Sequence, residues 1–198
     1  AAVSILEKIT SKSKSYLNSL VLSINPFGFR TYFRGSDKGD VKILTSKGWA
    51  KVFRTDISKG VEYIDQFKII VGRFVPSNGE MSVKPGEGYR VLTEPQILSP
   101  AEINTETYID TAVFSTLEEA TNYKKYLLTK FARFLLRQGI TSVNVTKECF
   151  AFVPIQDFTN RSDIDWNKSI HEIDNQLYIK YKLIDGEIAF VEKMIKQI

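Results

Sequence analysis

The stretch "STLEEATNYKKYLLTKFARFLLRQG", from Ser115 to Gly139, carries the clearest helical pattern in this chain. Two Ser/Thr-x-x-Glu pairs overlap at its start, Ser115 with Glu118 and Thr116 with Glu119, and either pair has the spacing of a capping box. Gly139 is well placed to end the helix, because glycine adopts the left-handed C-cap conformation without steric cost. The stretch therefore predicts one long helix at the centre of the fold.

The two faces of this helix differ in chemistry. At about 100° per residue, the apolar side chains that share one face are Leu117, Ala120, Leu127, Leu128, Phe131, Phe134 and Leu135. The opposite side gathers Tyr126, Lys130, Arg133 and Arg137. This basic stripe either contacts phosphates or forms the solvated back of an amphipathic helix, and the periodicity by itself favours the solvated back.

Strands are expected on both sides of the helix. "TYIDTAVF" (Thr107 to Phe114) predicts a strand before it, and "ECFAFVPI" (Glu148 to Ile155) predicts one after it. The region of about 27–106 has short β-like runs, which are "FRTYF", "VKILT", "AKVFRT" and "FKIIVGRFV". The turn clusters "GSDKGD", "SNGE" and "KPGEGY" separate those runs, so we expect irregular sheets with long polar loops there.

The two ends of the chain are expected to be helical. Residues 4–24 predict a helix followed by a strand or a connector at "SLVLSI". Two short helices are expected around Ile164 to Lys182 and Asp185 to Gln197. Because this tail is acidic and has apolar stripes, we interpret it as a docking appendage more than a second core.

These patterns together predict an α/β fold of the mixed α+β kind. It has irregular mixed β-sheets, a long central amphipathic helix and a helical C-terminal tail. Residues 1–160 are expected to form one domain, with a loop-rich β region at about 27–106 and a strand-helix-strand unit at about 107–155. Residues 161–198 form the tail.

Composition excludes several classes of protein. No run approaches the roughly 18 apolar residues of a membrane span, so no membrane partner is expected. The single cysteine, Cys149, excludes an internal disulfide and fits a cytoplasmic location. Cys149 lies in an apolar run and is expected to be buried, whereas His171 is expected to be a solvated histidine of the tail. The absence of an initial Met suggests a fragment or a processed chain.

Motifs of catalysis are lacking. The chain has no Glu-x-Lys pair and no phosphate-binding loop, and no His/Cys cluster has transition-metal spacing. Asn25-Pro26-Phe27 resembles the Asn-Pro-Pro-aromatic motif of amino-directed DNA methyltransferases but lacks its second proline. No glycine precedes Asn25, so a cofactor turn is missing and a simple turn is the better interpretation.

Positive charge is concentrated in one region. The net charge of the chain is +4, but residues 27–90 hold 12 Lys and Arg against 7 Asp and Glu, an excess of 5. Residues 147–198 hold 7 against 9, a deficit of 2. This asymmetry is typical of a protein with one face toward a polyanion, although an excess of this size also occurs on ordinary surfaces.

An ordered series of motifs in the second half resembles a known family. The segments are "TYIDTAVFSTLEEATNYKKY", "YLLTKFARFLL", "FAFVPIQDFT" and "IDWNKSIHEIDNQLYIKYKLIDGEIAFVEKMIKQI". They resemble the C-terminal region of bacterial restriction-modification proteins, in which a TaqI-like target-recognition domain follows an N6-adenine DNA methyltransferase domain. The resemblance covers 107–198, whereas residues 1–106 match only in texture.

The resemblance implies sequence-specific recognition of double-stranded DNA by a chain that is not itself an enzyme. No cofactor is expected in this chain. The parent catalytic domain, which is the expected intramolecular partner, would bind S-adenosylmethionine. Whether the parent also cleaves DNA stays open. An alternative is a protein-interaction module of a restriction-modification complex without direct base readout.

Candidate DNA contacts follow from the basic, loop-rich region and from the helix stripe. They are Arg30, Arg34, Lys47, Trp49, Lys51, Arg54, Lys59, Arg73, Lys84, Arg90, Lys130, Arg133 and Arg137. The cations would position the duplex through its phosphates, and base-edge contacts would specify it. Trp49 is either a contact at the groove edge or a core anchor, and its size favours the core.

Overall fold

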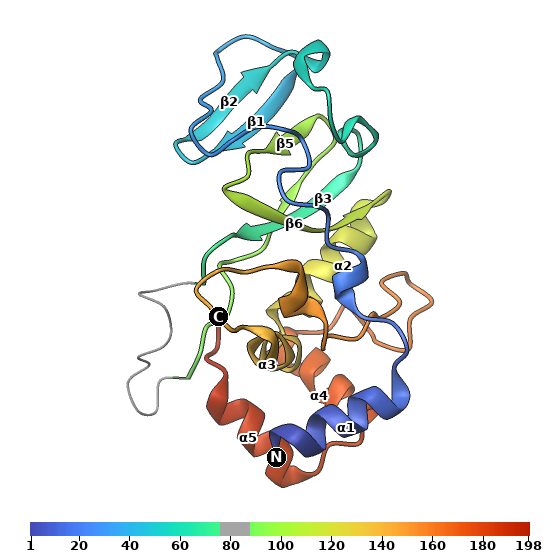
Figure 1. The fold of residues 1–198 in the computed structure, drawn as a ribbon. Helices are drawn as coiled ribbons and strands as arrows, with labels where there is room; N and C mark the ends of the chain where they lie inside the picture. The colour runs from blue at the N-terminus through green and yellow to red at the C-terminus, as the bar shows by residue number, and fades with distance from the viewer. Residues whose placement is uncertain (76–87) are drawn as a thin grey trace.

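The computed structural model describes residues 1–75 and 88–198 and has the predicted mixed α+β architecture (Figure 1). The α-helices are α1 (Ala2–Lys12), α2 (Leu117–Leu128), α3 (Lys130–Gly139), α4 (Ile170–Lys180) and α5 (Asp185–Met194). Short 3-10 helices are η1 (Leu17–Ser19), η2 (Arg54–Asp56), η3 (Val61–Tyr63) and η5 (Lys147–Phe150). The strands are β1 (Val41–Thr45), β2 (Gly48–Val52), β3 (Phe67–Gly72), β4 (Gln96–Leu98), β5 (Glu102–Asn104) and β6 (Tyr108–Phe114).

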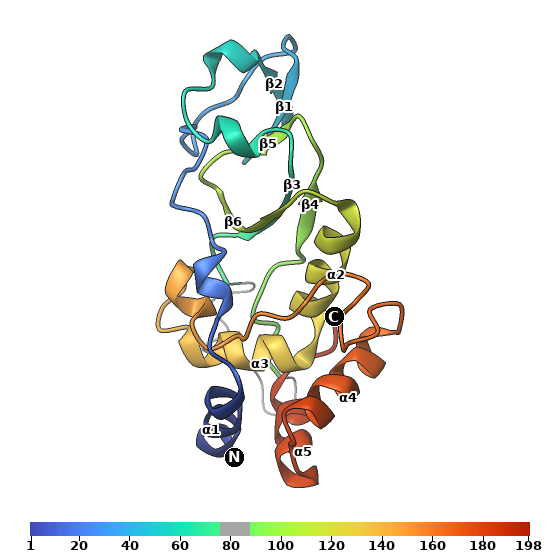
Figure 2. The ribbon, with the colours of Figure 1, turned by 90° about the vertical axis from the view of Figure 1, so that its right-hand side faces the viewer.

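The strands form two small sheets. The first has the order β2-β1-β5, with β1 antiparallel to β2 and parallel to β5. The second is antiparallel and has the order β4-β3-β6, with a register shift between Ile69 and Ile70. In Figures 1 and 2 the first sheet lies at one end of an elongated molecule, the second lies in the middle, and α1, α3, α4 and α5 lie at the other end.

Each part of the molecule has its own buried apolar cluster. The main core joins β3 and β6 to all five helices, and its aromatic centre is formed by Tyr123, Tyr126, Phe158 and Trp166. A smaller cluster lies under the first sheet, and its buried members are Phe27, Val41, Ile43, Val52, Ile57, Ile64 and Ile103. Between the two sheets, Leu44 packs with Ile70 and Leu98. The first sheet thus has a small core of its own and packs against the second sheet, which belongs to the main core.

The predicted central helix is two helices, because the chain breaks at Thr129. This residue has an extended backbone (φ −63°, ψ 148°) and caps α3, since its hydroxyl accepts a hydrogen bond from the Ala132 amide at 3.1 Å. The same hydroxyl donates to the Tyr126 carbonyl at 2.6 Å. At the start, Thr116 is the N-cap, since its hydroxyl accepts from the Glu119 amide at 3.2 Å and donates to the Glu119 carboxylate at 2.7 Å. A Thr inside an apolar pattern acts here as an N-cap.

The break changes the role of the basic stripe. Tyr126 in α2 and Arg133 in α3 were expected on a solvated back but are 0% exposed, because other parts of the chain pack against the side that bears them. The Tyr126 hydroxyl donates to the Pro154 carbonyl at 2.8 Å. Lys130 and Arg137 are half-buried. The expectation of a solvated back is therefore wrong for this helix.

The predicted strand at Glu148 to Ile155 is absent, and its first part is η5. Cys149 and Phe150 are consecutive and both buried, which the alternation of a strand on one core would not allow. The runs at 19–24 and 29–33 also lack strand structure. By contrast, the strand prediction is confirmed at β1, β3 and β6, and Cys149 is buried while His171 is exposed, as expected.

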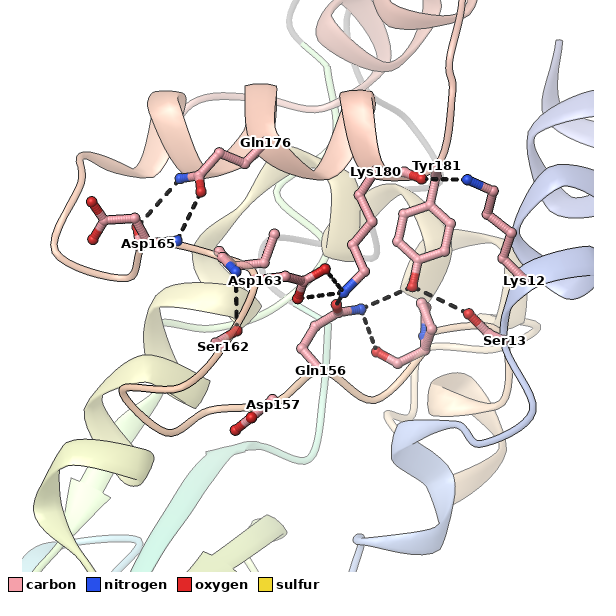
Figure 3. A network of polar contacts seen from close by, with 12 residues as sticks. Lys12, Ser13, Gln156, Asp157, Ser162, Asp163, Asp165, Gln176, Lys180 and Tyr181 are labelled. Carbon is pink, nitrogen blue, oxygen red and sulfur yellow. Dashed lines mark hydrogen bonds and ion pairs between the residues drawn. The ribbon is translucent and has the colours of Figure 1, made fainter.

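The helical tail is part of the main core and is not an appendage. Ile173, Leu177 and Val191 are fully buried in it. Figure 3 shows the polar network that fixes α4: the Lys180 ammonium donates to Gln156 and to Asp163, both at 2.8 Å, and Gln156 donates to the Tyr181 hydroxyl at 3.0 Å. The Lys12 ammonium donates to the Lys180 carbonyl at 2.7 Å, so residues 156–163 and α4 are held together with the end of α1.

Candidate nucleic-acid interface

The β1–β2 hairpin presents its tight turn to solvent. The Thr45 side chain closes this turn, since its hydroxyl donates to the Gly48 carbonyl at 2.8 Å and accepts from the Lys47 amide at 3.1 Å. Gly48 has a φ of +110°, which favours glycine. The turn holds Lys47, which is exposed, at the tip of the hairpin.

A glycine-containing loop covers the outer edge of β2. Ser36 and Lys51 exchange two backbone hydrogen bonds, at 2.8 and 3.0 Å. A Cβ on Gly39, at φ +139°, would lie 2.2 Å from the Val52 carbonyl oxygen, so only glycine fits. This loop protects the sheet edge and places the residues before it beside the hairpin.

One side of the hairpin alternates aromatic and basic residues. Trp49 and Phe53 are 51% and 50% exposed, and Lys51 between them is also exposed. Lys42 of β1 lies directly opposite Lys51, and Leu44, opposite Trp49, is buried between the sheets. We call Lys42, Lys47, Trp49, Lys51 and Phe53, together with the neighbouring Tyr32 and Arg34, the hairpin face.

Tyr32 and Arg34 belong to the hairpin face because the loop before β1 is bonded to the hairpin turn. The Arg34 guanidinium donates to the Ser46 hydroxyl at 3.3 Å and to the Thr31 carbonyl at 3.0 Å. Ser46 donates to that same carbonyl at 3.2 Å. The Tyr32 side chain is 78% exposed. Large aromatics in such positions are available for stacking.

The cations of this region divide into paired and unpaired groups. Arg30 is 3.1 Å from the Glu106 carboxylate, Lys42 is 3.4 Å from Glu102, and Arg54 makes a bidentate pair with Asp65 at 2.6 and 2.8 Å. Within the described parts of the chain, Arg34, Lys47, Lys51 and Lys59 are in no ion pair. The unpaired cations are those with positive charge free for phosphates.

The remaining candidates do not join the hairpin face. Arg133 is fully buried and donates to the backbone carbonyls of Leu128, Arg90 and Lys196, so no duplex can reach it. Lys130 is bound to Glu192 at 2.6 Å, and Arg137 stacks on the Tyr89 ring at 4.6 Å. Arg90 is exposed near α3, and Arg73 is half-buried at the end of β3. Lys84 lies outside the described residues.

Three members of the hairpin face, Tyr32, Lys42 and Phe53, are not among the candidates predicted from the sequence. Phe53 had a usable signal, because Trp49, Lys51 and Phe53 alternate with smaller residues at the period of a strand. Tyr32 had no such signal, because the run at 29–33 that contains it was expected to be a strand and is a loop. Trp49 was expected in the core and is half exposed, because β2 is the edge strand of its sheet.

The turn at Asn25-Pro26-Phe27 is structural, as expected. Asn25 has a φ of 56°, its carbonyl accepts from the Gly28 amide at 3.2 Å, and Phe27 is buried in the cluster under the first sheet. A Cβ on Gly60 would approach the Pro26 carbonyl oxygen to 2.7 Å. The turn thus anchors the loop that carries Tyr32 and Arg34.

Buried charges lie beneath the hairpin. The Lys68 ammonium is 0% exposed and donates to the carbonyls of Tyr63, Ile64 and Gln66, and burial lowers its pKa to about 8. Burial raises the pKa of Asp110 to about 7, although a hydrogen bond from Asn104 at 2.9 Å opposes that shift. These groups fix the junction of the sheets and are inaccessible to a ligand.

The part of the chain that the structure describes contains no group of three or more His, Cys, Asp or Glu side chains suited to a metal ion. In the same residues no helix has the length and apolar character needed to cross a membrane. Comparison with protein families, with curated proteins and with solved structures finds no match to this chain.

Proposed function

We propose that this chain is a target-recognition domain that binds double-stranded DNA for a restriction-modification N6-adenine methyltransferase. Catalysis and S-adenosylmethionine binding would reside in another domain of the parent protein, with which this chain would share the duplex. The chain itself would act as a DNA-binding domain and not as an enzyme.

The observation that carries this proposal is the hairpin face. It combines three exposed aromatic side chains, Tyr32, Trp49 and Phe53, with the unpaired cations Arg34, Lys47 and Lys51. Two-stranded β-ribbons are narrow enough to enter a DNA groove. A rigid hairpin with cations at its tip could therefore reach base edges, while its flanking lysines contact phosphates.

The division between scaffold and recognition supports the same function. The segments that resemble the restriction-modification family include Gln156, Lys180 and Tyr181, which make the scaffold network of Figure 3. The exposed cations and aromatics of the hairpin face lie in residues 1–106, which match the family only in texture. A specificity domain needs a fixed frame and a variable reading surface.

Selection from a pool of duplexes with randomised sequence tests the proposal. The chain should enrich one short site, and Arg34→Gln or Trp49→Ala should relax the preference at particular positions, because a base contact acts on one base pair. Lys168→Gln in the tail is the matched control and should enrich the same site as the parent chain. Recovery of an unbiased pool by the unmodified chain would refute sequence-specific recognition.

A protein-docking module is the alternative, and exposed apolar residues of the helical end favour it. Ile179 is 77% exposed at the end of α4, and Ile184 is 63% exposed at the start of α5. Under this alternative, crosslinks to a restriction-modification partner would map to residues 164–198 and duplex DNA would not bind. Crosslinking with and without duplex therefore separates the two functions.

A further inference from the structure

A second candidate site is a cavity of about 440 Å³ that shares no lining residue with the hairpin face. It lies where the end of β3, strand β6, the segment after η1 and the loop before η5 meet. Its lining includes two cations, Arg73 and Lys147, one carboxylate, Glu148, and apolar residues of the surrounding segments. The volume lies within the range of small-molecule sites in proteins.

Arg73 is the residue that gives this cavity its chemistry. Its backbone is held on both sides, since its amide donates to the Thr107 carbonyl at 3.2 Å and its carbonyl accepts from the Val145 amide at 2.7 Å. Its Nε is buried and has no hydrogen-bond partner, and no ion pair to its guanidinium is present in residues 1–75 and 88–198. A buried donor without an acceptor is costly, so an acceptor supplied by a ligand would stabilise this arrangement.

The charges around the cavity suit a small anion. Arg73 and Lys147 are positive, and the Lys147 ammonium is exposed and in no ion pair among the described residues. Glu148 is the one acidic lining residue, and its hydrogen bond with Thr146 at the start of η5 lowers its pKa and engages its carboxylate. The net positive charge and the planar fork of Arg73 favour a phosphate.

The rest of the cavity suits a flat, partly polar ring. Leu22, Ile24, Ile109 and Val145 supply apolar surface, and Ile24 is 70% exposed at the rim. The Asn144 side chain, which makes no hydrogen bond to the described residues, adds a donor and an acceptor beside that surface. A phosphate next to an apolar wall with one carboxamide matches the parts of a nucleotide.

We propose that this cavity binds a single nucleotide, with the phosphate on Arg73 and Lys147 and the base against Ile24 and Asn144. The site does not depend on the hairpin face. Its ligand is either a free nucleoside monophosphate or one nucleotide of a DNA strand, and both sources present the same chemistry.

Titration of the ¹⁵N-labelled chain with deoxyadenosine monophosphate, followed by amide chemical shifts, tests the site. Saturable shifts should appear at 22–24 and 144–148, and deoxyadenosine and inorganic phosphate alone should bind more weakly. Arg73→Gln should lower the affinity for the nucleotide by about tenfold or more, because a charged hydrogen-bonded contact is lost. Ile24→Ser should lower the affinity for the nucleotide but leave the affinity for inorganic phosphate unchanged.

Further variants separate this proposal from the proposed function. Arg34→Gln on the hairpin face should weaken the binding of duplex DNA and leave the binding of the nucleotide intact. If Arg73→Gln does not fold, Lys147→Gln at an exposed position replaces it. Displacement of the nucleotide by duplex assigns the site to a DNA strand, and simultaneous binding assigns it to a free nucleotide. Absence of saturable shifts, or shifts confined to the hairpin face, would overturn the proposal.

Discussion

Asp110→Asn should stabilise the protein at alkaline pH. Asp110 is 1% exposed, and burial raises its pKa from 3.8 to about 7. Between pH 3.8 and about pH 7, Asp110 is therefore protonated in the native protein but ionised in the unfolded chain. Unfolding releases that proton, so stability falls as pH rises through this window. The difference between 3.8 and about 7 corresponds to about 4 kcal/mol at most.

The neighbours of Asp110 support an asparagine at this position. One Asp110 oxygen accepts from the Asn104 amide, whereas the other oxygen and the Asn104 carbonyl oxygen are buried without partners. Asparagine keeps the acceptor and adds a donor for Asn104. Lys68 and Arg73 attract the carboxylate and lower its pKa, but burial outweighs both. The substitution thus removes a net electrostatic cost and retains the shape.

Urea unfolding followed by tryptophan fluorescence, from about pH 5 to about pH 9, measures the effect. The two proteins should have similar stability near pH 5, and Asp110→Asn should be more stable by about 2–4 kcal/mol near pH 9. Asp56→Asn at an exposed position is the matched control and should follow the parent chain. A constant difference between Asp110→Asn and the parent across this range would refute the reasoning.

Three further substitutions test the scaffold. Arg133→Met should lower the free energy of unfolding by about 2–4 kcal/mol, because the carbonyls of Leu128, Arg90 and Lys196 lose a buried donor; unchanged DNA affinity of the folded fraction would separate this role from a phosphate contact. Gly39→Ala should cost about 2 kcal/mol or more in urea unfolding, since its Cβ would lie 2.2 Å from the Val52 oxygen, and a neutral result would contradict the loop geometry. Thr116→Ala should cost about 1 kcal/mol and reduce helicity measured by circular dichroism, with Ser115→Ala as the neutral control.

Patterns of periodicity predicted the elements that bury one face over several residues. β1, β3 and β6 have such patterns and formed near their expected bounds, and α2 begins near the predicted start of the central helix. The break at Thr129 was not predictable from periodicity, because the apolar positions continue through it and the cap depends on a local hydrogen bond. The run at Glu148 to Ile155 was misread because β-branched and aromatic residues also fill irregular buried segments.

The candidate site was predictable in part. Sequence located the basic region and named Arg34, Lys47 and Lys51, because cations are countable without a fold. It could not show that Asp65 and Glu106 neutralise Arg54 and Arg30, since those pairs join residues 11 and 76 positions apart. The burial of Arg133 depends on the C-terminal Lys196 carbonyl, a contact over 63 positions that no local pattern encodes.

The salt dependence of DNA affinity tests the central claim most directly. For a pool of mixed-sequence duplexes, the logarithm of the affinity of the unmodified chain should fall linearly with the logarithm of salt concentration. Combined Arg34→Gln, Lys47→Gln and Lys51→Gln substitutions should flatten the slope by about 0.9 for each lost phosphate contact. The matched set Lys168→Gln, Lys182→Gln and Lys193→Gln, at exposed positions of the tail, should leave the slope unchanged. Absence of binding at low salt, or an equal slope in the hairpin-face variant and the parent chain, would contradict a DNA-binding hairpin face.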